Sequence, residues 1–291
     1  MVTDQASALR ELKRRFDTEA AGGAPPATAE ELVAGLPRPC PFPAIALLPT
    51  PSPLEPLPDL LPWLPIPWHS TPRATLWDEA CLLPFGTVPP MAVGEERPPL
   101  LTQSASGRGP LWIMPPQPSL GRLGRRPQEQ RLCDLHLVTT ALREVTELWV
   151  ALRAESVRTR AELVLGCDFA VHLVSDHPDA ILRGYEAVKA LHLLGFFAPQ
   201  AVVIVEQELG GQGAAAFARL EQVSRNFLNL ELHFAGAIPC PRDGAAPPGP
   251  PPEQVLPALL ERLHPATRDF LSVLCEQVLY PAPEEPLRPH V

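Results

Sequence analysis

The sequence has little of what marks secreted, membrane-spanning, metal-binding or nucleic-acid-binding proteins. No apolar run is long enough to span a membrane, and the charged segment Met1–Phe16 has no apolar core of the kind that a signal peptide needs. The six cysteines are scattered without a C-x-x-C pair, which favours buried thiols over a metal or disulfide site. A net charge of −9 argues against a nucleic-acid surface over the whole chain. We therefore expect a cytoplasmic protein with no metal, no nucleic-acid partner and no membrane contact.

Lysine is scarce, whereas proline is abundant. Only Lys13 and Lys189 are lysines, but 40 residues are prolines, concentrated in stretches such as 22–109 and 246–252. Because proline lacks an N–H and fixes φ, these stretches are expected to contain little helix. Ala44–Leu48 is the strand that we expect within the first stretch, and repeated proline argues against a central strand elsewhere in it. The Leu and Trp side chains between the prolines indicate extended chain lying on a surface, not a free linker.

Composition divides the chain into four regions. They are an N-terminal helix at 1–21, a proline-rich segment at 22–109, an α/β core at 110–242, and a proline linker with C-terminal helices at 243–291. In the first region, Leu9, Leu12 and Phe16 recur at helical spacing before a Gly-Gly pair that ends the helix. In the last region, helices are expected at Gln254–Leu263 and Ala266–Val278.

Residues 110–242 alternate between apolar runs and amphipathic segments. The expected strands are Leu111–Met114, Leu148–Leu152, Phe169–Val174, Ala201–Val205 and Leu230–Ala235. The expected helices are Gln128–Val145, Ser156–Leu165, Asp179–Leu194 and Ala214–Leu228. Apolar strands that alternate with amphipathic helices are typical of a parallel sheet covered on both faces. The sequence therefore predicts an α/β fold with a mostly parallel sheet and helices on both faces.

Four stretches of the sequence carry a family resemblance. The segment from Asp4 to Arg10 reads D-Q-A-S-A-L-R and fits the signature D-Q-A-x-x-L-R at every fixed position. Ser175–Lys189 is similar to the segment T-P-E-P-T-S-I-T-D-A-Y-A-x-I-K, and the positions in register are Pro178, Ile181, Tyr185 and Lys189. Leu111–Pro115 and Phe217–Gly236 match more loosely. In these stretches the chain resembles the FlhG branch of the MinD/ParA ATPases, which implies a P-loop-NTPase-like fold in degenerate form.

The chain departs from that family at the positions that bind and hydrolyse ATP. The family's P-loop, K-G-G-x-G-K-[ST], cradles phosphate with backbone N–H groups and a lysine, and no Gly-Lys dipeptide occurs in this sequence. Proline-rich chain follows Ala44–Leu48, where the P-loop belongs. One acidic position of the family falls on Leu152, which can neither hold Mg²⁺ through a water nor orient an attacking water, and another falls on Arg183. We therefore expect a pseudo-ATPase that carries no cofactor.

The N-terminal signature gives the most specific functional expectation. In the family, the resemblance implies that this helix activates an SRP-type GTPase, FlhF, with the glutamine at its active site. The chemistry is reasonable, because a glutamine amide can orient the attacking water beside a γ-phosphate. The residues expected to carry this role are Asp4, Gln5, Ala6, Leu9 and Arg10. The resemblance thus implies a non-catalytic protein that acts in flagellar number or placement control.

Other interpretations of the whole chain and of Gln5 stay open. The chain could be a MinD-like protein that binds nucleotide without hydrolysing it, or a proline-rich adaptor for protein interactions. Gln5 itself could be a solvated residue on a capped N-terminal helix.

Other patterns suggest sites but have simpler explanations. Leu209–Gly213 resembles a phosphate loop without its lysine and hydroxyl, so a strand-to-helix turn is expected. Asp176, His177 and Asp179 follow a strand, where α/β sheets place ligands, yet helix capping and solvation account for them. His172 is expected to pack within its strand. A solvated turn is expected for the arginines at positions 122, 125, 126 and 131, and the helix Ala266–Val278 is expected to dock on the protein's own core, not on a membrane.

Overall fold

The computed structural model describes residues 42–50, 74–80, 102–106, 109–114, 128–143, 145–206, 212–239 and 270–279. The strands are β1 (Ala44–Pro49), β2 (Ala74–Asp78), β3 (Thr102–Ser106), β4 (Gly109–Met114), β5 (Glu147–Ala151), β6 (Phe169–Ser175), β7 (Gln200–Glu206) and β8 (His233–Pro239). The helices are α4 (Gln128–Leu142), the 3₁₀ turn η4 (Ala154–Ser156), α5 (Ala161–Val164), α6 (Pro178–Leu193), α7 (Gly213–Leu228) and α9 (Phe270–Leu279). Within these residues, none of the helices combines the length and the hydropathy that a membrane crossing requires.

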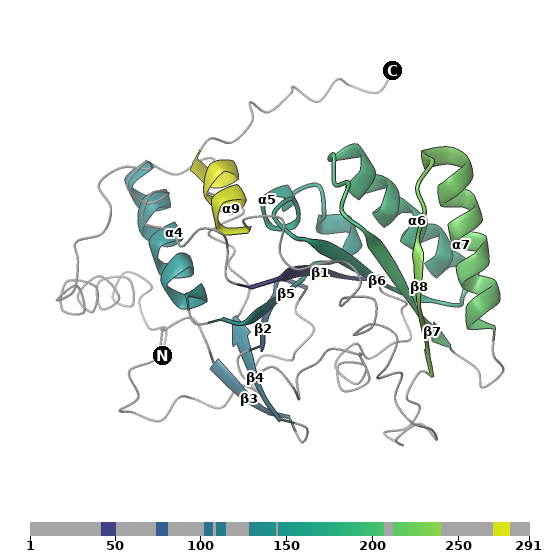
Figure 1. Cartoon of the computed structure of the whole chain (residues 1–291), viewed down its shortest axis with the longest axis horizontal. Helices are drawn as coiled ribbons and strands as arrows, with labels where there is room; N and C mark the ends of the chain where they lie inside the picture. Colours follow the sequence, from purple (N-terminus) through teal and green to yellow (C-terminus); the bar gives the residue numbers. More distant parts are fainter. Residues whose placement is uncertain are drawn as a thin grey trace, which may run out of the picture.

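All of these strands belong to one sheet (Figure 1). Their order is β3-β4-β2-β5-β1-β6-β7-β8. Neighbouring strands run parallel, except for the antiparallel pair of β3 and β4 at one edge. Parallel strands are buried on both faces, which explains why β1, β5, β6 and β7 consist of nearly continuous apolar residues. The predicted α/β fold with a mostly parallel sheet is confirmed.

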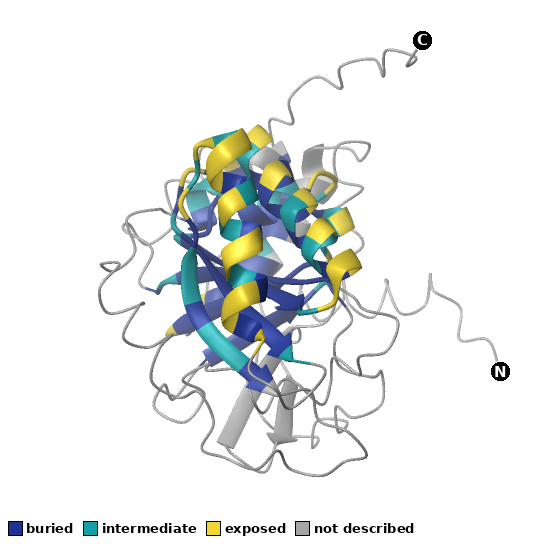
Figure 2. Cartoon of the chain, turned by 90° about the vertical axis from the view of Figure 1, so that its right-hand side faces the viewer, coloured by how far each residue is buried: buried dark blue, intermediate teal, exposed yellow. Residues whose placement is uncertain are grey.

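The described helices lie along one side of the sheet (Figure 1). Alternate strand residues such as Ala46 and Val150 face them, since side chains of a strand point to opposite faces in turn. Helices α4, α5 and α9 pack over the centre of the sheet in one apolar cluster, which contains Leu135 and Phe270. Helices α6 and α7 form a second cluster over β6 and β7. Figure 2 shows the resulting layers, with buried strands beneath helices whose outer surfaces are exposed.

The opposite face of the sheet is buried as well. Ile45, Leu47, Trp149 and Val203 alternate with the helix-facing residues, and each is at most 1% exposed. On this face the indole N–H of Trp149 donates to the carboxylate of Glu147. The sheet is therefore covered on both faces, as its apolar strands predict. The expectation that helices cover this second face falls outside the described residues.

The proline-rich region contributes more to the sheet than the sequence predicted. The strand expected at Ala44–Leu48 is confirmed as β1, which lies in the interior of the sheet. The expectation that proline excludes a further inner strand is wrong, because β2 lies between β4 and β5. Residues 73–83 contain no proline, and they supply Leu76 and Trp77 to the buried interior. The sheet thus extends beyond the predicted core at 110–242 and includes strands from 22–109.

Two predicted boundaries also differ for local reasons. The helix expected at Ser156–Leu165 is reduced to η4 and the single turn of α5. Between them, the Thr159 hydroxyl donates to the Ser156 carbonyl, a local bond that competes with helix formation. The strand expected from Leu230 begins only at His233, because Asn229 ends α7 in the left-handed conformation (φ 51°) and the next residues complete that helix end.

Helix α6 approaches the sheet closely at one glycine. A Cβ atom on Gly184 would lie 2.9 Å from Cγ2 of Val174 in β6, closer than carbon atoms in proteins normally come. A valine side chain is stiff at χ1 and cannot turn away easily. The glycine therefore sets the distance between α6 and β6 and, with it, the position of the helix residues that line the pocket described below.

Candidate functional site

The strand order reverses beside β1. From β1 the chain passes to β2 on one side of the sheet, and from β5 it crosses to β6 on the other side. Ligands of open α/β sheets bind outside the carboxyl ends of the strands at such a point. The backbone is well tied there, because the N–H of Thr50 donates to the Leu173 carbonyl and the N–H of Leu152 donates to the Leu47 carbonyl, both at 2.9 Å. This edge is the position that the fold favours for a site.

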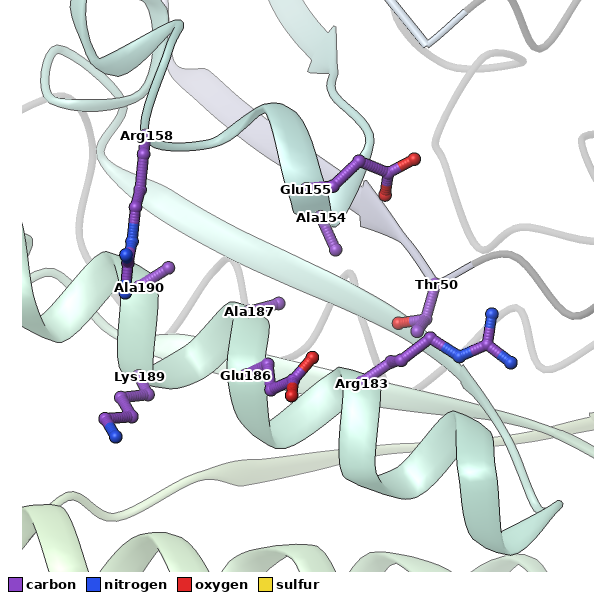
Figure 3. Close-up of a pocket in the computed structure, with 9 residues that line it drawn as sticks. All are labelled: Thr50, Ala154, Glu155, Arg158, Arg183, Glu186, Ala187, Lys189 and Ala190. Atoms are coloured by element: carbon purple, nitrogen blue, oxygen red, sulfur yellow. The ribbon is translucent and has the colours of Figure 1, made fainter. Parts of the chain in front are cut away.

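A pocket of 420 Å³ opens at this edge, between η4 and α6 (Figure 3). Thr50 lies at the end of β1 and lines it from the sheet side. The remaining small residues of the lining are Ala154, Ala187 and Ala190, and its charged residues are Glu155, Arg158, Arg183, Glu186 and Lys189. Thr50 and two of the alanines are buried, whereas four of the charged side chains are exposed. The pocket therefore has a small-residue floor and a charged rim.

Leu152 and Arg183 lie near this edge. The sequence resemblance aligns them with two acidic positions of the MinD/ParA ATPases. Leu152 follows β5, and its side chain is fully buried in the apolar cluster beneath α4 and α9. It therefore offers the edge neither a charge nor a hydrogen-bonding group. Arg183 lies on α6 and lines the pocket, so the structure places a cation there.

Polar residues that the sequence interpretation missed gather at the carboxyl end of β2. Asp78 is 3% exposed, and Glu79 accepts a hydrogen bond of 2.8 Å from the Trp77 indole N–H. The guanidinium of Arg160 lies 2.6 Å from Glu79 and 2.8 Å from Glu162. Asp78 and Glu79 were missed because β2 was not predicted. The proline-free run at 73–83, which turns from apolar to acidic, was the signal that could have located them.

The loop candidates behave as capping residues. His177 is the N-cap of α6, where its Nδ1 accepts a hydrogen bond of 3.3 Å from the backbone N–H of Asp179. The backbone N–H of His177 in turn donates to the Ser175 hydroxyl. The prediction of ordinary capping is confirmed for His177, whereas Asp179 lies in the first turn of α6 and the backbone N–H of Asp176 donates to the Val205 carbonyl. No group of three or more His, Cys, Asp or Glu side chains is arranged for a metal ion within the residues that the structure describes.

His172 is a packed strand residue, as predicted. It is 0% exposed, and its Nε2 lies 2.9 Å from Oε1 of Gln200 on the neighbouring strand. Burial lowers the pKa of His172 to about 4, outweighing the opposite effect of the hydrogen bond to Gln200. The imidazole is therefore neutral near neutral pH and has a structural role.

The remaining sequence candidates are placed only in part. The signature residues Asp4, Gln5, Ala6, Leu9 and Arg10 lie outside the described residues, as do the side chains of the arginine cluster at 122–131. Of the glycine-rich segment 209–213, Gln212 and Gly213 are described; Gln212 is the N-cap of α7, and Gly213 begins that helix and donates its N–H to Glu206 at the end of β7. The predicted docking of the C-terminal helix on the protein itself is confirmed, because Phe270 and Leu274 of α9 are fully buried in the core.

Comparisons with known proteins find similarity in the fold. Neither a protein-family profile nor a curated protein matches the sequence. Among solved structures, the MinD cell division protein of Aquifex aeolicus is 12% identical and matches over 84% of this chain and 100% of its own, with a TM-score of 0.45. A plasmid-partition-type protein of Borrelia burgdorferi bound to AMPPNP is 11% identical over 76% of this chain and 99% of its own, with a TM-score of 0.46. A ParA family ATPase of Chlorobium tepidum is 9% identical over 82% and 98%, with a TM-score of 0.42.

Proposed function

We propose that this chain is a non-catalytic protein that presents its N-terminal segment to an SRP-type GTPase of the FlhF kind, in flagellar number or placement control. The observation that carries the proposal is the segment from Asp4 to Arg10, which matches the D-Q-A-x-x-L-R signature at every fixed position. The apolar residues Leu9, Leu12 and Phe16 follow at helical spacing and can anchor the segment on a partner. Gln5, about one turn before Leu9, can then reach the partner's nucleotide.

The non-catalytic part of the proposal rests on the residues that ATP hydrolysis needs. The full sequence contains no Gly-Lys dipeptide for a P-loop. Leu152 is buried in the core at a position where the family has an acid. A leucine at this position can neither hold Mg²⁺ through a water molecule nor orient the attacking water itself. Both features support a protein that acts on a partner's reaction instead of catalysing its own.

The proposal is tested by adding the peptide Met1–Ala20 to the partner GTPase and measuring GTP turnover. A helix of this length is marginal alone, so it is expected to fold on the partner. Wild-type peptide should stimulate turnover, and Gln5→Ala should remove most of the stimulation while the apolar anchors keep it bound. Leu9→Asp should remove both. Ser7→Ala, at a variable position of the signature, is the matched control and should stimulate like wild type. No stimulation by the wild-type peptide would contradict the proposal.

A second candidate function is nucleotide binding without hydrolysis. The pocket at the end of β1 favours it, because Arg158, Arg183 and Lys189 line a cavity at the edge where α/β sheets bind ligands. Calorimetric titration of the full chain with ATP and Mg²⁺ separates the two candidates. Micromolar affinity would support this second function, whereas no measurable binding is expected from the missing P-loop lysine.

A further inference from the structure

We propose that the pocket between η4 and α6 binds a small zwitterion of the amino-acid class that carries a second carboxylate. The inference uses only the pocket and not the N-terminal segment, so it goes beyond the proposed function, and the two stand or fall separately. The pocket offers a ligand three features: a buried hydroxyl group, a floor of alanine side chains and a rim with charges of both signs.

The buried hydroxyl belongs to Thr50. The residue is 1% exposed, and its Oγ1 has no hydrogen-bond partner among the residues that the structure describes. Its backbone N–H, by contrast, is bonded to the Leu173 carbonyl. Buried polar atoms in native proteins are nearly always paired, and an unpaired one costs stability that a ligand atom can restore. Since Thr50 lines the pocket, a ligand in the pocket is the natural source of that partner.

The floor of the pocket is built from alanines. Ala187 and Ala190 lie one turn apart on the inner face of α6, and Ala154 faces them from η4 (Figure 3). Methyl side chains leave the volume open, and the contact at Gly184 fixes α6 on β6 so that the helix keeps its place. A volume of 420 Å³ holds a small organic molecule, whose aliphatic part would lie on these methyl groups.

The rim determines the charge of the ligand. Arg183 and Glu155 lie at the Thr50 end, Glu186 lies along the middle, and Arg158 lies toward the far end, where the Lys189 side chain points away from the cavity (Figure 3). A simple anion would meet two carboxylates, and a simple cation would meet two guanidinium groups. A molecule with two carboxylates and one ammonium complements both signs. Its α-carboxylate would bind Arg183 and Thr50, its ammonium would bind Glu155, and its second carboxylate would extend toward Arg158.

Calorimetric titration of the full chain with L-glutamate and L-aspartate tests the proposal. Glutarate lacks the ammonium and L-glutamine lacks the second carboxylate, so each should bind about tenfold more weakly or worse. Arg183→Ala should weaken glutamate or aspartate binding by about tenfold or more, because it removes a charged hydrogen-bond donor. Arg219→Ala, on the exposed surface of α7, is the matched control and should bind like wild type.

Thr50→Val separates a ligand-binding role from a structural one. Valine has the shape of threonine, and the hydroxyl that it removes has no partner within the described part of the chain, so the melting temperature should stay the same or rise. Affinity for the amino acid should nevertheless fall several-fold. Ala154→Met, which fills the pocket from its half-buried wall, should abolish binding without unfolding the protein.

Three results would overturn the inference. They are the absence of binding by either amino acid at millimolar concentration, binding that both Arg183→Ala and Thr50→Val leave unchanged, and displacement of the bound amino acid by ATP. The last result would assign the pocket to a nucleotide.

Discussion

His172 and Gln200 form a polar pair inside an otherwise apolar layer between the sheet and its helices. Both residues are at most 1% exposed, and the side-chain hydrogen bond that the described residues supply joins His172 Nε2 to Gln200 Oε1. His172 Nδ1 and Gln200 Nε2 have no partner among those residues. Burial therefore opposes protonation strongly, because a charged imidazole would lose its hydration without gaining a counterion. The pair makes stability depend on pH.

The first prediction concerns the direction of that dependence. The pKa of His172 is about 4 in the folded protein and 6.5 in the unfolded chain, so the unfolded state binds more protons between these values. Its contribution to stability is full above about pH 6.5 and is lost as pH falls toward 4, with a total on the order of 3 kcal/mol. Urea unfolding of wild type and of His172→Gln, which keeps a donor toward Gln200, measures the difference.

The expected result is a weaker loss of stability on acidification in His172→Gln than in wild type. His177→Asn changes an exposed histidine and should leave the wild-type pH dependence in place. If His172→Gln and wild type lose the same free energy of unfolding between about pH 7 and pH 5, then His172 is not the titrating group.

The sequence predicted the character of single residues where the surrounding element was predicted. His172 was placed correctly because it stands within a run of strand-forming apolar residues, where a polar side chain has to be buried and paired. Thr50 and Arg160 were not singled out. Their importance depends on which atoms of distant segments reach them, and no spacing along the chain contains that information. Arg160, for example, contacts Glu79, which lies 81 positions earlier.

At the scale of elements, the contact of Arg160 with Glu79 joins the end of β2 to the start of α5. The two side chains are only 11% and 5% exposed, and Arg160 also lies 2.8 Å from Glu162. Glu79 is held further by the Trp77 indole. A mostly buried ion pair with this many hydrogen bonds is costly to break, because the remaining partner keeps a buried, uncompensated charge. This pair can fix the irregular segment between η4 and α5.

The second prediction is that Arg160→Met destabilises the protein by about 3 kcal/mol or more, since it removes a guanidinium that lies 2.6 Å from a carboxylate only 5% exposed. Arg225→Ala is the matched control, because Arg225 pairs with Glu221 on α7 but is 59% exposed. Removing that exposed pair should cost about 0.5 kcal/mol or less. Both free energies come from urea unfolding. A loss below about 1 kcal/mol in Arg160→Met would show that the pair contributes no more than a surface pair.

Long periodic elements were predictable, and short ones were not. Helices α6 and α7 and strands β6 and β7 were placed within about two residues, because each contains enough positions for a period to be recognised. The region 156–165 failed because the Thr159 hydroxyl bonds to the Ser156 carbonyl and the backbone of Arg160 leaves the helical conformation (φ −127°, ψ 37°). Strand β2 failed because a short buried strand has no alternation, and the prolines around it were given too much weight.

At the scale of the whole molecule, β1 joins two halves of the sheet. It pairs with β5 on one side and with β6 on the other. The first apolar cluster spans this junction, since it includes Leu148 of β5, Ala46 of β1 and Ala170 of β6. The second cluster lies beneath α6 and α7. Because both halves share β1 and α6 contributes to both clusters, the described sheet should unfold as one cooperative unit.

The last prediction tests that cooperativity with the chain's own tryptophans. All five of them precede residue 150, and the two whose side chains are described, Trp77 of β2 and Trp149 of β5, are buried in the half of the sheet before β6, so their fluorescence reports on that half. Leu220→Ala removes a fully buried side chain of α7 in the other half of the sheet and should lower the free energy of unfolding by about 2–5 kcal/mol.

If the sheet unfolds as one unit, Leu220→Ala lowers the urea midpoint by the same amount whether unfolding is followed by tryptophan fluorescence or by circular dichroism. Leu182→Ala, at a position 60% exposed, should move neither midpoint appreciably. A fluorescence midpoint that stays at the wild-type value while the circular dichroism midpoint falls would mean that β6, β7 and β8 unfold separately from the rest, and that β1 does not couple the two halves.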